Sequence, residues 1–222
     1  MLPHVILHNS ISLDGRNTMF IPDLGVHYEI IGRFNMDVHL AGSNTLANPV
    51  EPVPPENEQV FKAPKKDPKD TRPLLVVPDS KGIVRSWHAV RSASFWRDYI
   101  ALCTKRTPKD YIDYLDKRYI NHIIIGDDHV DLKAALELLY ENYEAKMVVL
   151  DAGGTLNGIM LRAGLVDEVS LLVHPVLLGG ASPKQFFKTE DYSNEEGPIK
   201  LKLMTNEKLG DNLVWLRYKV IE

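Results

Sequence analysis

The segment whose residue types best suit chemistry is Asp-Ala-Gly-Gly-Thr-Leu-Asn-Gly, residues 151–158, between a predicted strand and a predicted helix. The adjacent glycines let the backbone approach a ligand closely, and the free N–H groups of the next helical turn attract an anion such as a pyrophosphate. The same glycine pair is also typical of a tight turn that binds nothing. The segment lacks the Gly-Lys-Ser or Gly-Lys-Thr of a Walker loop and the usual dinucleotide spacing, so by itself it is a weak indication of phosphate binding.

Three further polar turns follow predicted strands, at residues 12–15 (Ser-Leu-Asp-Gly), 42–45 (Gly-Ser-Asn-Thr) and 79–82 (Asp-Ser-Lys-Gly). Each alone is more often a simple loop, and the Asp-Gly pair of the first is an ordinary turn signal. In open α/β sheets, however, ligands bind outside the carboxyl ends of the strands. Four such turns at successive strand ends therefore predict a cleft along one edge of a parallel sheet.

Short apolar runs predict the strands that must position these turns, at residues 5–7, 38–41, 74–77, 99–103, 122–125, 147–150 and 169–173. Helices are predicted after Asp23, after Pro108, after Asp131, and over residues 155–163 with Gly164 as terminator. Near the carboxyl end, residues 200–204 and 213–220 flank a Gly210-Asp211 turn and predict an antiparallel hairpin.

This alternation predicts an α/β fold of three layers, α/β/α, with a mostly parallel central sheet and a C-terminal antiparallel hairpin. Residues 49–73 hold seven of the fourteen prolines, which excludes a regular helix or central strand there. We expect this stretch to be a surface excursion from one domain that spans residues 1–222.

Composition narrows the function further. The chain has 26 Lys plus Arg and 30 Asp plus Glu, a net charge of −4, which argues against a nucleic-acid-binding protein. The single cysteine, Cys103, excludes an internal disulfide and a cysteine-based zinc site, and the eight histidines show no metal-binding spacing. The amino terminus does not resemble a signal peptide, and no apolar run approaches the ~18 residues of a membrane span, so we expect a cytoplasmic protein.

The four turns, together with Ala-Gly-Leu-Val-Asp-Glu-Val at residues 163–169, occur in an order that resembles a known family. This family is the riboflavin-biosynthesis reductases, or RibD C-terminal domain, of the dihydrofolate-reductase-like superfamily. The resemblance runs from Val5 to the final hairpin and is most specific over residues 151–180. We expect the zinc deaminase domain that often precedes this reductase to be absent.

The resemblance implies NADPH as cofactor and a phosphorylated pyrimidine as substrate. Hydride would reach C1′ of a 5-phosphoribosylamino-pyrimidine and convert its ribosyl group to ribityl. The residues that the resemblance places against the cofactor are Gly153, Gly154, Thr155 and Leu156 at the pyrophosphate, Ser10 near the nicotinamide, and Thr45 and Ser80 at other parts. It places Arg33 at the substrate, on its phosphate, and Asp151 where the family commonly has a glutamate beside the substrate. It also implies a homodimer.

A carboxylate beside the reacting imine could stabilise the developing cation or relay a proton. Asp151 is the first candidate for this catalytic role and Asp14 the second. Residues 46–52 lack the acidic pair that the family has after its Gly-x-x-Thr motif, and this difference falls on the substrate side. Two alternatives therefore stay open: a related reductase of another small heterocycle such as a pterin, and a nucleotide-binding module without catalysis.

Overall fold

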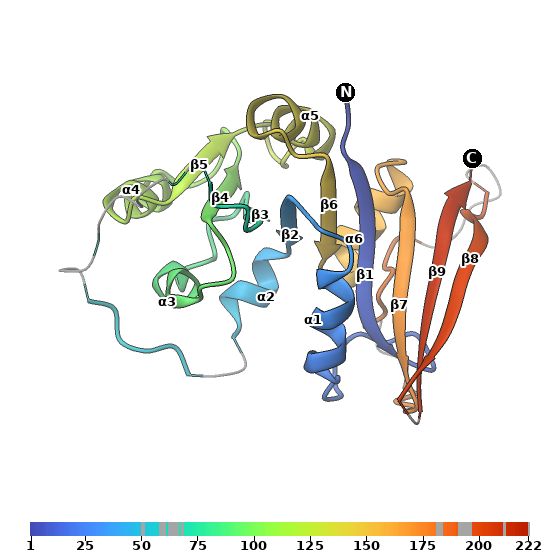
Figure 1. Ribbon diagram of the computed structural model, residues 1–222. Coiled ribbons are helices and arrows are strands. Elements are labelled where there is room, and N and C mark those ends of the chain that lie inside the picture. The colour runs from blue at the N-terminus through green and yellow to red at the C-terminus, as the bar shows by residue number, and fades with distance from the viewer. Residues whose placement is uncertain are drawn as a thin grey trace. The chain divides into compact units, whose positions relative to one another are not determined.

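The computed structural model describes residues 1–49, 52–57, 61, 67, 69–180, 184–190, 197–210 and 212–221. In chain order the elements are β1 (His4–Ser12), α1 (Leu24–Gly32), β2 (Val38–Ala41), α2 (Ser43–Ala47), β3 (Leu74–Pro78), α3 (Trp87–Ser92), β4 (Asp98–Cys103), α4 (Lys109–Lys117), β5 (Asn121–Ile124), α5 (Leu132–Tyr143), β6 (Met147–Asp151), α6 (Gly154–Arg162), β7 (Glu168–His174), β8 (Lys200–Leu209) and β9 (Leu213–Ile221) (Figure 1). The contacts divide the chain into two compact units, which are described in turn.

Unit 1 consists of residues 1–3 and 37–146. Its strands β2, β3, β4 and β5 pair in that order, and all three pairings are parallel. Helices α3 and α4 contribute the fully buried Trp87 and Tyr111 to a core with the strand residues Leu75 and Ala101. The indole N–H of Trp87 donates to the Tyr111 hydroxyl at 3.0 Å, so this fully buried indole has its hydrogen-bond partner.

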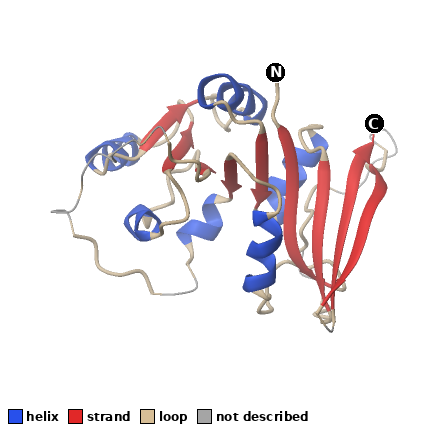
Figure 2. Ribbon diagram, viewed as in Figure 1, coloured by secondary structure: helices blue, strands red, loops and turns tan. Residues whose placement is uncertain are grey.

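Unit 2 consists of residues 4–36 and 147–222. Strand β1 pairs in parallel with β6 on one side and with β7 on the other, and the antiparallel β9 and β8 follow β7 (Figure 2). Helix α1 lies on one face of this sheet and α6 lies behind it (Figure 1). Ile30 and Ile31 of α1 pack with Ile6 of β1, Val149 of β6 and Trp215 of β9.

The predicted strands, the helix caps at Asp23 and Asp131, and the C-terminal hairpin are present. Strand β1, however, extends five residues past Leu7, to Ser12, because its polar second half is buried and bonded to neighbouring elements. Residues 42–45 were expected to form a turn, but Gly42 instead precedes the short helix α2. Helix α3 was not predicted at all.

The proline-rich stretch has no helix or strand over the described residues 52–57, of which 52–55 and 57 are exposed. Residues 50, 51, 58–60, 62–66 and 68 of that stretch, and Asp211 of the predicted turn, lie outside the described residues. Gly210 of the same turn has a φ of +54°, as a tight hairpin requires. Within the described chain, no helix combines the length and the apolar character needed to cross a membrane.

Candidate active site

A buried polar chain links three elements of unit 2 at the carboxyl end of β6. Side chains alternate along β1, so Ser10 faces α1 together with Ile6, and along β6 Asp151 shares a face with Val149. His27 of α1 lies between them: Nδ1 is 2.9 Å from Ser10 Oγ, and Nε2 is 3.1 Å from Asp151 Oδ2. The structure thus brings two predicted residues, Ser10 and Asp151, together through a third that was not predicted.

The Asp151 carboxylate stands at the boundary between this chain and solvent. Its side chain is 22% exposed, whereas that of His27 is 6% exposed. Asn9 Nδ2 lies 3.5 Å from the other oxygen, Oδ1. Burial, and then the negative charge of Asp151, raise the pKa of the neighbouring Tyr28 phenol. Asp151 therefore presents a carboxylate to solvent, and the buried His27 holds this carboxylate from below.

The opposite face of β1 holds the backbone turn that follows Asp151. Asn9 Nδ2 donates to the carbonyl of Ala152 at 3.0 Å. Asn157 of α6 donates to the same carbonyl at 3.1 Å and to Asn9 Oδ1 at 2.6 Å. Two side-chain amides therefore hold the start of the Gly-Gly turn in place.

Helix α6 begins directly after this turn with Gly153 as its N-cap, and a glycine has no side chain with which to cap the first N–H groups. Gly153 and Thr155 are exposed, Gly154 and Leu156 are half-buried, and a Cβ at Gly153 would meet nothing within 4 Å. First-turn N–H groups carry a partial positive charge and attract anions. The four predicted pyrophosphate residues thus form a helix N-terminus next to Asp151 that is open at Gly153 and Thr155.

Asp14 has a different environment, in the turn after β1. Its oxygens accept hydrogen bonds from Ser12 Oγ (2.7 Å), Gly179 N (2.8 Å) and Leu178 N (3.2 Å), and Arg16 Nε lies 3.3 Å away. The Ser12 hydroxyl, followed by the Gly179 N–H, holds the pKa of this carboxyl well below its usual range. These contacts join the β1 turn to the segment after β7.

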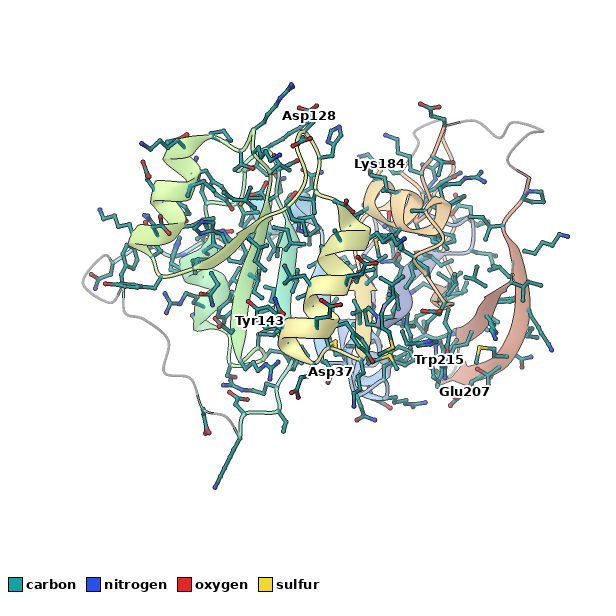
Figure 3. The ribbon with its side chains drawn as sticks, turned by 90° about the horizontal axis from the view of Figure 1, so that it is seen from above. Asp37, Asp128, Tyr143, Lys184, Glu207 and Trp215 are labelled. Carbon is teal, nitrogen blue, oxygen red and sulfur yellow. The ribbon has the colours of Figure 1, made fainter. Side chains whose placement is uncertain are left out.

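Arg33, the predicted substrate residue, is the C-cap of α1. Its guanidinium donates to Glu29 at 2.8 Å and lies 3.5 Å from the Glu207 carboxylate of β8. It also stacks on the ring of Trp215, 5.2 Å from the ring centre. Glu207 and Trp215 are cross-strand partners in the C-terminal hairpin, and Figure 3 labels both. Arg33 is six residues beyond His27, or roughly 9 Å along the helix axis. The structure therefore places Arg33 with the C-terminal hairpin, and a role at the substrate stays a prediction.

The two remaining predicted residues, Thr45 and Ser80, belong to unit 1. Thr45 is exposed on α2, directly after β2, and Ser80 is half-buried directly after β3. Since β2 and β3 are parallel neighbours, both residues lie at the same edge of the unit 1 sheet. Thr107 Oγ1 donates to the Ser80 carbonyl at 2.9 Å and fixes that turn.

Three functional candidates were missed in the sequence: His27, Asn9 and Asn157. Had β1 been extended to Ser12, its period of two would have placed Ser10 and Asn9 on opposite buried faces. His27 is three residues before the buried Ile30, so it lies on the same face of α1. Neither signal identifies Asp151 as the partner, because β1 and β6 are about 140 residues apart in the chain.

Comparisons with known proteins point to one family. A family model described as the RibD C-terminal domain matches residues 3–215. A curated 2,5-diamino-6-ribosylamino-4(3H)-pyrimidinone 5′-phosphate reductase of Methanothermobacter thermautotrophicus is 26% identical over 230 residues, covering 96% of this chain and 97% of that protein. The Aquifex aeolicus protein of the same name is 23% identical, covering 96% and 94%.

Solved structures show the same fold. Acinetobacter baumannii RibD superposes with a TM-score of 0.68 at 19% identity, and the match covers all of this chain but 59% of that longer one. Dihydrofolate reductase of Enterococcus faecalis superposes with a TM-score of 0.51 at 8% identity over 99% of this chain. The predicted α/β, dihydrofolate-reductase-like fold is confirmed, and so is the predicted family: the chain belongs to the RibD C-terminal domain family.

Proposed function

We propose that this oxidoreductase is an NADPH-dependent enzyme that reduces a 5-phosphoribosylamino-pyrimidine, converting its ribosyl group to ribityl in riboflavin biosynthesis. The observation that carries the proposal is the partly exposed Asp151 carboxylate directly before the glycine-capped N-terminus of α6. In a member of this family, that arrangement supports a charged group for the substrate beside an anion site for the cofactor.

On the cofactor side, the residues present fit a dinucleotide. The N–H groups of Gly154, Thr155 and Leu156 suit a diphosphate, and the open space at Gly153 lets it approach the backbone. We assign Ser10 to the nicotinamide region, and Thr45 and Ser80 to other parts of the cofactor. When bound, NADPH supplies the hydride, so the protein has to align the reacting groups and exclude water.

On the substrate side, we assign to Asp151 the carboxylate that lies beside the reacting imine. A proton on the nitrogen of the ring-opened imine makes C1′ electrophilic. C1′ then accepts the hydride, the C=N π electrons become the nitrogen lone pair, and the product is a secondary amine. The Asp151 carboxylate stabilises the positive charge on that nitrogen. Asp14 does not suit this role, because its oxygens already accept four hydrogen bonds.

The curated relatives are named for a 2,5-diamino pyrimidinone, so we propose this non-deaminated form as the first substrate to test. The assay follows loss of NADPH absorbance with the diamino pyrimidinone phosphate, its deaminated counterpart and dihydrofolate as separate acceptors. We expect turnover with a phosphoribosylamino-pyrimidine and none with dihydrofolate. Turnover with dihydrofolate alone would support a pterin reductase, and tight NADPH binding without any turnover would support a non-catalytic module.

We also propose a homodimer that forms through the C-terminal hairpin. The described residues of β8 from Lys200 to Lys208 are all exposed, and Leu201, Leu203 and Met204 are each more than 40% exposed. Unpaired edge strands with apolar side chains are ready templates for pairing with another chain. A second copy of this chain would cover that edge. A single domain over residues 1–222 and a cytoplasmic location stay predictions.

A further inference from the structure

His27 is a buried imidazole whose two nitrogens both lie at hydrogen-bonding distance from polar side chains. The residue is 5% exposed and lies beneath Asp151, on the side away from solvent. It is reached from β1 by Ser10 and from β6 by Asp151. A buried polar side chain with two such partners is held in one orientation, because rotation of the ring would break both bonds.

The chemistry of the partners assigns the hydrogen atoms. An ionised carboxylate only accepts, so the His27 Nε2 that lies 3.1 Å from Asp151 Oδ2 carries a hydrogen and donates it. In the neutral ring Nδ1 is then an acceptor, and the Ser10 hydroxyl at 2.9 Å donates to it. Asp151 therefore sets the tautomer, and the Ser10 hydroxyl, which can donate or accept, completes it and holds the ring in place.

Among the described groups that face His27, the Asp151 carboxylate is the one that carries a negative charge. From β1, the His8 ring lies 4.6 Å away between ring centroids, and His8 itself pairs with Ser170 Oγ at 2.9 Å. From α1, Tyr28 contacts the ring edge to face at 5.1 Å. From β6, Asp151 brings the negative charge. The donor from Nε2 therefore favours the ionised form of Asp151.

We infer that His27 is a positioning residue for the proposed reduction: through Nε2–H it fixes the orientation and the charge of the Asp151 carboxylate, and the bond to Ser10 holds the His27 ring in place. This inference rests on the proposed function. His27 acts through Asp151 and does not touch the substrate. Without that donor, the carboxylate loses the 3.1 Å bond that favours its charged form, while the 3.5 Å contact from Asn9 remains.

Two substitutions separate positioning from simple packing. In His27→Gln the side-chain amide nitrogen takes the place of Nε2 and can still donate to Asp151. In His27→Asn the shorter amide reaches the place of Nδ1, toward Ser10, and loses Asp151. A hydrogen bond to a charged group is worth about tenfold to hundredfold in an equilibrium. We expect His27→Asn to lower kcat by that factor, and His27→Gln to stay within about threefold of the wild type.

Further measurements distinguish the loss of a hydrogen bond from a packing defect, which would lower the stability of the variants as well as their rate. The Tm and the Kd for NADPH should change equally little in both variants. The double variant with Asp151→Asn should be no slower than Asp151→Asn alone, because both changes remove the same unit. His122→Asn is the matched control, since this half-buried histidine of β5 lies 3.6 Å from the Asp116 carboxylate. We expect that control to retain the wild-type rate.

A measurement without turnover completes the test. Carbon-13 NMR of the Asp151 carboxyl should show a pKa higher by about 1 to 2 in His27→Asn than in the wild type or His27→Gln. Equal kcat in the two His27 variants, an additive double variant, or an Asp151 pKa that does not respond would each overturn the inference. If the wild type reduces no pyrimidine, the proposed function falls, and the NMR result still decides whether His27 holds Asp151.

Discussion

At the scale of single residues, Asp14 and Asp151 show how different hydrogen-bond partners give two aspartates different roles. Asp14 receives two backbone N–H groups and a hydroxyl, which stabilise its charged form and tie two loops together. Asp151 receives its 3.1 Å contact from His27 and keeps part of its surface in solvent. An anchor, a carboxylate that ties loops together, needs oxygens that accept several hydrogen bonds from the protein. A carboxylate that contacts a substrate needs an oxygen that is accessible from solvent.

Substituting Asp151→Asn tests the proposed reacting carboxylate. The amide keeps the shape and can still accept from His27, but it cannot carry the charge that stabilises a protonated imine. We expect kcat to fall by about a hundredfold or more, with the Kd for NADPH within about twofold. Steady-state kinetics and a fluorescence titration with NADPH measure the two effects. Asp110→Asn, on the exposed face of α4, is the control, and equal rates in both variants would remove Asp151 from catalysis.

Substituting Asp14→Asn tests the anchor through the pH dependence of stability. Because the folded pKa of Asp14 is lowered, its contribution is fully present above the unfolded value of about 3.9 and is lost as pH falls through the folded pKa. We expect the variant to have a lower Tm than the wild type at about pH 7 and pH 5. The difference should shrink below about pH 4, as measured by thermal melts. A difference that stays constant at acid pH would contradict this.

At the scale of elements, the turn from β6 into α6 shows why its glycines differ. A Cβ at Gly154 would lie 2.0 Å from the carbonyl oxygen of Gln185, and one at Gly158 would lie 2.1 Å from that of Lys188. Lys188 N also donates to the Gly154 carbonyl at 3.0 Å. The second and third glycines of the motif are therefore required by close packing against residues 185–188, and only Gly153 faces open space.

Substituting Gly154→Ala tests whether this glycine is required by close packing against residues 185–188. The added methyl group must displace backbone, and such overpacking costs about 1–3 kcal/mol. In a chain of this size that corresponds to a fall in Tm of roughly 2–4 °C per kcal/mol. Gly32→Ala is the control, because a Cβ at this residue of α1 meets nothing within 4 Å, and its Tm should stay the same or rise slightly. Equal melts for both variants would show that the close approach is absent.

Elements could be predicted well where apolar periodicity was strong and poorly where polar residues were buried. Strand β3 and helix α5 have regular apolar patterns and strong boundaries, a proline after Val77 and a capping Asp131. The second half of β1 contains Asn9, Ser10 and Ser12, which resemble a loop. They are buried because Asn157, His27 and the backbone of Arg16 satisfy them, and those partners are distant or unpredicted.

At the scale of the whole molecule, unit 2 is assembled from the two ends of the chain. His4 of β1 pairs with Met147 of β6, and Ile6 pairs with Glu168 of β7. All of unit 1 except residues 1–3 lies between them in the sequence. Pairings of such large sequence separation form slowly, because loop-closure entropy is lost before contacts repay it. The Ser10–His27–Asp151 chain can therefore exist only after residues from both ends have met.

The proposed homodimer is tested by charge on its edge. Leu203→Lys places a cation on β8, where the leucine is 48% exposed in the single chain, so burial against a second copy would become costly. We expect sedimentation to show a dimer for the wild type and a monomer for the variant, with an unchanged Tm at low concentration. Ile124→Lys changes an exposed residue of β5, the edge strand of unit 1, and should remain dimeric. A wild-type monomer, or dissociation by Ile124→Lys alone, would contradict the proposal.

Local information in the chain was sufficient for the α/β class, most strand positions, the helix caps and the Gly-Gly turn before α6, because periodicity and capping act over a few neighbouring residues. Its family motifs also pointed to Asp151 and to residues 153–156. Folding alone determined that Asp14 is an anchor, that Arg33 joins the C-terminal hairpin, and that His27 lies under Asp151. Those outcomes depend on hydrogen bonds between residues more than 100 positions apart, and such partners leave no periodic signal in a sequence.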